Sequence, residues 1–100
     1  PVFLDYDMDI VEELCGSELA STSYAFGSLA RKGAHVAYGT DCPVEDCNPF
    51  PNIYMAVTRM NRAGKPAGGF YPQEKVDVER STPIQWKALT ESLWKTEKAG

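Results

Sequence analysis

Histidine and cysteine, the usual side-chain ligands of zinc, are scarce in this 100-residue chain. The sequence has one histidine, His35, and three cysteines, Cys15, Cys42 and Cys47. A small, odd number of cysteines favours a reducing cytoplasm over a disulfide framework. Cys42 and Cys47 could bind zinc together with His35, but this loose spacing supplies no fourth ligand. We therefore expect thiols rather than a zinc site.

Long apolar runs and clusters of basic residues are also absent. No stretch approaches the roughly 18 apolar residues of a membrane span, and no charged-then-apolar leader is present, so we expect a cytoplasmic protein without membrane contact. Ten Lys and Arg against fourteen Asp and Glu give a net charge of −4, which argues against a nucleic-acid partner. With 43% hydrophobic and 24% charged residues, the composition is typical of one soluble globular domain.

The hydrophobic pattern predicts the α/β fold class. Pro1–Leu4 resembles the end of a β-strand, and Val36–Thr40 is predicted to be a short buried strand. Between them, Ser17 can cap a helix that runs to Lys32, with Gly33 well placed to end it. A strand, a helix and a strand in this order form a β-α-β unit with parallel strands.

Several polar and glycine-rich stretches are predicted to be loops. Asp5, Asp7 and Asp9 resemble part of a calcium loop, but the required glycine and closing glutamate are missing, so we expect solvated acids. After a proline-rich loop, the pattern predicts a second helix over Asn52–Arg62. Residues 64–69 are predicted to form a plain turn, because no Lys-Ser/Thr pair follows to complete a phosphate loop.

Asp41 is the residue whose position most suggests chemistry. It follows the predicted strand Val36–Thr40, and residues at the carboxyl ends of strands line the active sites of parallel sheets and barrels. The alternative is a carboxylate that only caps the loop. His35 lies at the opposite end of the same strand, so we expect a structural or surface histidine there rather than a ligand.

Three blocks of sequence occur in the order expected for a known family: G-T-D-C-P-V-E, N-P-F-P-N-I-Y and A-V-T-R. With these blocks, the chain resembles the amidohydrolase superfamily over about residues 1–79. The chain is most similar to the amidohydrolase family 3 branch, which includes N-substituted formamide deformylases and exoenzyme regulatory protein-like members. The resemblance implies a fragment of a (β/α)8 barrel, with Pro1–Leu4 as strand seven, Ser17–Lys32 as its helix and Val36–Thr40 as strand eight. It also implies that Asp41 is the aspartate that binds the catalytic metal or takes a proton from its bound water.

The other metal ligands that the resemblance implies are missing. The family places a His-x-His pair after strand one, a lysine or acid on strand four and histidines on strands five and six, whereas this chain has only His35. Two of eight βα units also cannot close a barrel. We therefore expect a full-length parent with a zinc-type metal to hydrolyse carbon–nitrogen bonds, and this chain alone to be inactive and without a cofactor. The alternative is a non-enzymatic, self-associating remnant or small interaction module with no ligand.

Residues 80–100 depart from the family pattern. The family would continue with a helix resembling A-Y-T-V-E-S-A-Y, which a shifted reading frame can recover, so we interpret this segment as an out-of-frame translation. Its own pattern still predicts a helix over Pro83–Lys98 with Thr82 as N-cap. That helix would either cover an exposed sheet or present Trp86 and Trp94 to another chain. Exposed strand edges and aromatic side chains together predict a homo-oligomer, a dimer or larger.

Overall fold

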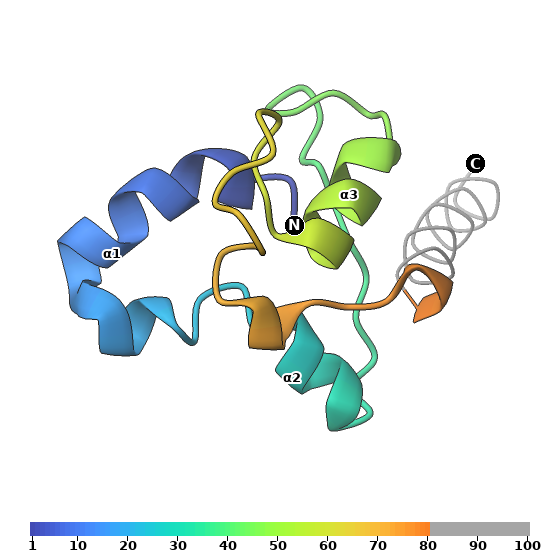
Figure 1. The fold of residues 1–100 in the computed structure, drawn as a ribbon. Helices are drawn as coiled ribbons and strands as arrows, with labels where there is room; N and C mark the ends of the chain where they lie inside the picture. Colours follow the sequence, from blue (N-terminus) through green and yellow to red (C-terminus); the bar gives the residue numbers. More distant parts are fainter. Residues whose placement is uncertain (81–100) are drawn as a thin grey trace, which may run out of the picture.

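The computed structural model describes residues 1–80, and this part of the chain is mostly helical (Figure 1). Its elements are α1 (Leu4–Ala20), α2 (Phe26–Arg31), α3 (Phe50–Thr58) and a short 3-10 helix, η1 (Pro72–Glu74). Residues 78–80 are also helical. No β-strand occurs between residues 1 and 80, so the two predicted strands are not formed there. The predicted helix Pro83–Lys98 lies outside the described residues.

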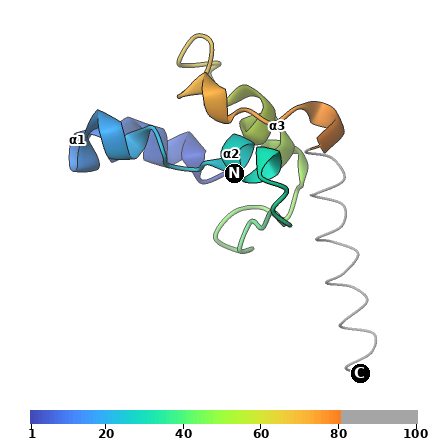
Figure 2. The same ribbon diagram turned by 90° about the horizontal axis from the view of Figure 1, so that it is seen from below.

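The core lies where the beginning of α1 meets α3 and the segment around residue 70. Five buried side chains form its centre, and three partly buried ones pack against them: Leu4, Met8, Ala20, Met55 and Phe70, with Val11, Tyr24 and Tyr71. Both ribbon views show the middle of α1 extending away from α2 and α3 (Figures 1 and 2). Burial of apolar area stabilises this cluster by about 25 cal/mol per Å², and it fixes the N-terminal helix against segments late in the chain.

The prediction of a strand over Pro1–Leu4 is wrong. The backbone N–H of Leu4 donates to the carbonyl of Pro1 at 3.0 Å, and that of Asp5 donates to Val2 at 3.1 Å, so the chain turns directly into α1. A short apolar run fits a buried strand and a buried helix turn equally well, and periodicity cannot separate them. The acidic residues Asp5, Asp7 and Asp9 consequently lie on α1 and not in a polar loop.

The predicted helix Ser17–Lys32 is formed only in part, because residues 21–25, between α1 and α2, are not helical. The hydroxyls of Ser21 and Thr22 donate to the carbonyls of Glu18 and Leu19 at 2.6 and 2.8 Å. Such local side-chain bonds compete with the helical pattern and favour a turn. Tyr24 then takes a left-handed conformation with φ of 52°, after which α2 begins.

The second predicted helix, Asn52–Arg62, exists with different bounds. Proline within the first turn of α3 suits a helix start, so the helix begins at Phe50. It ends at Thr58 because Arg59 has a left-handed backbone, with φ of 51°. The remaining predicted strand, Val36–Thr40, has no regular secondary structure, since the segment expected to pair with it, Pro1–Leu4, turns directly into α1.

Within residues 1–80, no helix combines the length and the apolar character needed to cross a membrane.

Candidate functional site

Asp41, the residue predicted to carry chemistry, lies at the first position of an exposed turn. Its backbone φ is 51°, and its carbonyl accepts a hydrogen bond from the N–H of Val44 at 2.9 Å. The N–H of Glu45 donates to the carbonyl of Thr40 at 3.2 Å and closes the turn. The Asp41 carboxylate has no hydrogen-bond or ion-pair partner among residues 1–80, so it is available to an external group.

The loop that follows Asp41 is tied to the beginning of α1. The hydroxyl of Tyr6 donates to the Glu45 carboxylate, and this bond is the main reason why the pKa of Tyr6 is raised. Arg62 lies between two acids, 3.5 Å from Glu45 and 3.3 Å from Asp5. These contacts give the turn that carries Asp41 a defined place beside α1.

The candidate metal ligands are not brought together in the described part of the chain. No three His, Cys, Asp or Glu side chains between residues 1 and 80 lie close enough to hold a metal ion. His35 is exposed, as are the free thiols of Cys15, Cys42 and Cys47. The residues present therefore do not fit a catalytic metal by themselves, and the metal-binding role of Asp41 stays a prediction.

The buried polar residues bind the backbone of the protein. Arg59 is fully buried, and its guanidinium donates to the carbonyls of Phe70 at 2.5 Å, Tyr24 at 2.6 Å and Ser23 at 3.1 Å. Burial lowers the pKa of Arg59, and the charge of Glu74 partly offsets this effect. A planar guanidinium suits such a fork of acceptors, so Arg59 joins the end of α3 to the α1–α2 turn and to the segment at residue 70.

Asn52 makes a second buried connection. Its Oδ1 accepts a hydrogen bond from the N–H of Val2 at 2.9 Å, and its Nδ2 donates to the carbonyl of Gly39 at 3.3 Å. Because buried backbone groups need partners, Asn52 fixes both the start of the chain and the segment that leads to Asp41. Asn52 and Arg59 belong to the N-P-F-P-N-I-Y and A-V-T-R blocks, and no sequence pattern predicted these structural roles.

Glu74 holds α2 against η1. Its carboxylate accepts hydrogen bonds from the Ser28 N–H at 2.7 Å and the Ser28 hydroxyl at 2.5 Å, and it lies 3.7 Å from Arg31. Burial raises the pKa of Glu74, but the bonds from Ser28 and the charges of Arg31 and Arg59 outweigh it, so the pKa is below its ordinary value. Gly27 allows the close approach, because a Cβ there would lie 2.8 Å from the Glu74 backbone.

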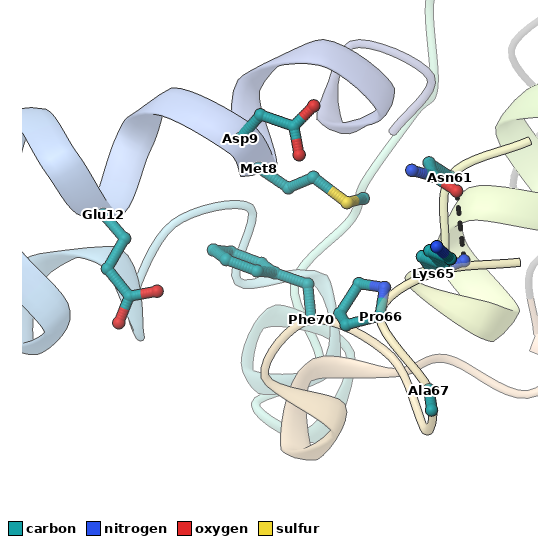
Figure 3. A pocket seen from close by; sticks show the side chains of 8 residues that line it. All are labelled: Met8, Asp9, Glu12, Asn61, Lys65, Pro66, Ala67 and Phe70. Atoms are coloured by element: carbon teal, nitrogen blue, oxygen red, sulfur yellow. Dashed lines mark hydrogen bonds between the residues drawn. The ribbon is translucent and has the colours of Figure 1, made fainter. Parts of the chain in front are cut away.

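A cleft of about 540 Å³ lies between α1 and the segment 61–70 (Figure 3). It was not predicted from the sequence. Its lining combines acidic, basic, amide and apolar side chains: Met8, Asp9, Glu12, Asn61, Lys65, Pro66, Ala67 and Phe70. Glu12 accepts a hydrogen bond from the Tyr71 hydroxyl at 2.9 Å. This volume falls within the usual range of small-molecule sites.

Comparison with known proteins connects these features to a family. A model described as "Amidohydrolase family" matches residues 1–85. The chain is 46% identical over 55 residues to Protein LONG AFTER FAR-RED 3 from Arabidopsis thaliana, a match that covers 54% of this chain and 9% of that protein. No solved structure matches. The resemblance inferred from the three sequence blocks is confirmed at the level of the family, and this chain belongs to the amidohydrolase family.

Proposed function

We propose that this chain is a segment of a metal-dependent amidohydrolase, and that the full-length protein hydrolyses carbon–nitrogen bonds of the amide type. The observation that carries this proposal is the family match over residues 1–85. Because the chain spans only 9% of the length of its Arabidopsis relative, most of a catalytic site of this kind would lie in other parts of a longer protein.

In that longer protein, Asp41 would be the aspartate that follows the eighth strand of a (β/α)8 barrel. Residues 1–4 and 36–40 would then gain neighbouring strands with which to pair, which the described residues do not offer them. A divalent metal in such a site polarises a carbonyl and activates water. The exposed Asp41 carboxylate, unengaged within residues 1–80, supports a role as a metal ligand or proton acceptor.

The isolated chain is not expected to catalyse this reaction. Three protein ligands are usual at a catalytic zinc, and residues 1–80 hold no group of three candidate ligands. We therefore assign no metal-dependent step to the 100-residue chain itself. The catalytic proposal concerns the longer protein, in which the missing histidines would come from elsewhere.

The coding DNA on both sides of this reading frame provides the test. An upstream frame that encodes barrel segments with a His-x-His pair would support the proposal, and an unrelated upstream sequence would contradict it. The joined protein, supplied with zinc, should then hydrolyse an N-substituted formamide. Asp41→Asn should lower kcat/KM by at least about 100-fold, whereas Asp46→Asn in the same loop should leave it unchanged.

A self-associating remnant without catalysis is the second candidate. Large apolar side chains are exposed on several elements, with Leu14 at 78%, Phe50 at 72% and Val44 at 71% of their full exposure. A second copy of the chain could cover some of these side chains. Light scattering at micromolar concentration should then give the mass of a dimer or larger, reduced by Leu14→Ser or Phe50→Ser. A monomer with cooperative unfolding would contradict this candidate.

A further inference from the structure

We propose that the cleft between α1 and the segment 61–70 binds the zwitterion of an amino acid with an apolar side chain. The cleft has an acidic wall on α1 and a hydrogen-bond-donating wall opposite (Figure 3). Its floor is apolar. This proposal concerns residues other than Asp41, and it stands independently of the proposed hydrolysis.

Asp9 supplies the charge that would hold the ammonium group. Its carboxylate has no hydrogen-bond or ion-pair partner in the described part of the chain, and it points across the cleft toward Asn61 (Figure 3). Glu12, one helical turn further along the same wall, is already bound to the Tyr71 hydroxyl at 2.9 Å. Asp9 is therefore the acid of this wall that has no partner among residues 1–80.

The opposite wall can hold a carboxylate. The Oδ1 of Asn61 accepts bonds from the N–H groups of Ala63 at 2.9 Å and Lys65 at 3.0 Å. These two bonds fix the orientation of the amide, so that its Nδ2 group faces the cleft as a donor without a partner among residues 1–80 (Figure 3). The Lys65 ammonium has no ion pair among residues 1–80 and adds a positive charge to this wall.

The apolar floor determines what the rest of the ligand should be. Met8 and Phe70 are both buried, and Pro66 and Ala67 continue the apolar lining beside them. Methionine sulfur and an aromatic ring both make favourable contacts with an aromatic ligand. A volume of about 540 Å³ has room for a phenylalanine-sized molecule.

A metal cation is the competing occupant of an acidic wall, and the lining argues against it. The described residues contain no group of three candidate metal ligands, in this cleft or elsewhere. Lys65, on the opposite wall, would also repel a cation. A zwitterion fits both walls, because its ammonium group can lie against the acidic wall and its carboxylate against the wall that carries Lys65.

The proposal can be tested by NMR titration of the 100-residue chain with L-phenylalanine. We expect saturable shifts of the Met8, Asn61 and Phe70 amides, with a dissociation constant on the order of millimolar for so small a ligand. 3-Phenylpropionate lacks the ammonium group and phenethylamine lacks the carboxylate. Each analogue should bind about twofold to fivefold more weakly, as the loss of one exposed ion pair implies.

Variants assign each end of the ligand to its wall. Asp9→Asn and Lys65→Met should each weaken phenylalanine binding about twofold to fivefold. Asp9→Asn should not weaken the binding of 3-phenylpropionate, which has no ammonium group to lose. Glu13→Gln and Lys32→Met are matched controls, because both residues are exposed and neither lines the cleft. These controls should leave the affinity unchanged.

Four results would overturn the proposal. The first is the absence of saturable shifts up to about 20 mM phenylalanine, which would put the dissociation constant far above the expected range. The second is shifts that lie outside the cleft, and the third is equal affinity for phenylalanine and its two analogues. Magnesium or zinc chloride that produces the same shifts in place of phenylalanine would also refute it. The analogue series uses the unaltered chain, so the test stands even where a variant fails to fold.

Discussion

The Nη1 atom of Arg59 donates a hydrogen bond to the backbone carbonyl of Tyr24, 2.6 Å away and 35 residues earlier in the chain. Arg59 has the left-handed backbone that ends α3, and Tyr24 has the left-handed backbone just before α2. The bond therefore connects these two turns. Two helix boundaries that the sequence pattern missed are therefore held together by one side chain. The same guanidinium reaches the carbonyl of Phe70, so it also fixes the floor of the cleft.

Arg59→Lys should destabilise the protein strongly. A lysine ammonium cannot reproduce the planar fork that binds three carbonyls, and buried acceptors without partners are costly. We expect the free energy of unfolding in urea to fall by about 2–4 kcal/mol. Arg62→Lys is the matched control, since Arg62 is largely exposed. Its free energy of unfolding should fall by less than about 1 kcal/mol. Equal losses for the two variants would refute the structural role of Arg59.

Gly27→Ala tests the contact between α2 and η1. Alanine is favoured over glycine in a helix by roughly 1 kcal/mol, so helix propensity alone predicts a more stable protein. The new Cβ would lie 2.8 Å from the Glu74 backbone, however, and that clash should dominate. We expect a net loss of about 1–3 kcal/mol in the free energy of unfolding.

A second glycine gives the control for this steric argument. At Gly39 an added Cβ meets its nearest atom, Oδ1 of Asp41, at an ordinary 3.5 Å. Gly39→Ala should therefore leave stability unchanged within about 0.5 kcal/mol. A stabilised Gly27→Ala variant would show that α2 and η1 are not in close contact.

Glu74 should make stability depend on pH in the acidic range. Because its folded pKa lies below the value in the unfolded chain, protons bind the unfolded state more readily and stability rises with pH. The contribution is complete above the unfolded pKa, about 4.3, and is lost as pH falls through the lower folded pKa. Glu74→Gln, which cannot titrate, should be less stable than the natural chain by about 1–2 kcal/mol at pH 7.

The pH profile of that difference is the decisive observation. The deficit of Glu74→Gln should shrink progressively as the solution is acidified, because the natural chain loses its advantage on protonation. Glu13→Gln, at an exposed site on α1, should show a small difference that changes little with pH. A Glu74→Gln deficit that stays constant down to acid pH would refute the charge-dependent bonds to Ser28 and Arg31.

The sequence predicted local features better than it predicted contacts between residues that are far apart in the chain. The helical pattern around Ile53 and Val57 correctly indicated α3, because apolar spacing along a helix is a local signal. The prolines before it were assigned to the loop, so the start at Phe50 was missed. The end of α3 was missed, since it depends on the left-handed turn at Arg59 and its bonds to distant carbonyls. The run at residues 1–4 was assigned to a strand because a short apolar segment does not distinguish strand from helix.

The candidate site likewise has one feature that the sequence could predict and one that it could not. The turn at Asp41 could be predicted from its position after an apolar run and from the family resemblance. The cleft could not be predicted, because Asp9 and Lys65 come from segments that are far apart in the sequence. These segments line one cleft only because Met8 and Phe70 pack together in the core. Periodicity and motifs carry no information about such long-range contacts.

The metal content of the purified 100-residue chain tests the central claim most directly. After incubation with zinc and removal of unbound metal, we expect well below one equivalent of bound zinc, and the same value for Asp41→Ala. One carboxylate without histidine partners is a weak ligand set. One full equivalent of zinc, abolished by Asp41→Ala, would contradict the claim that the rest of a longer amidohydrolase must complete this site.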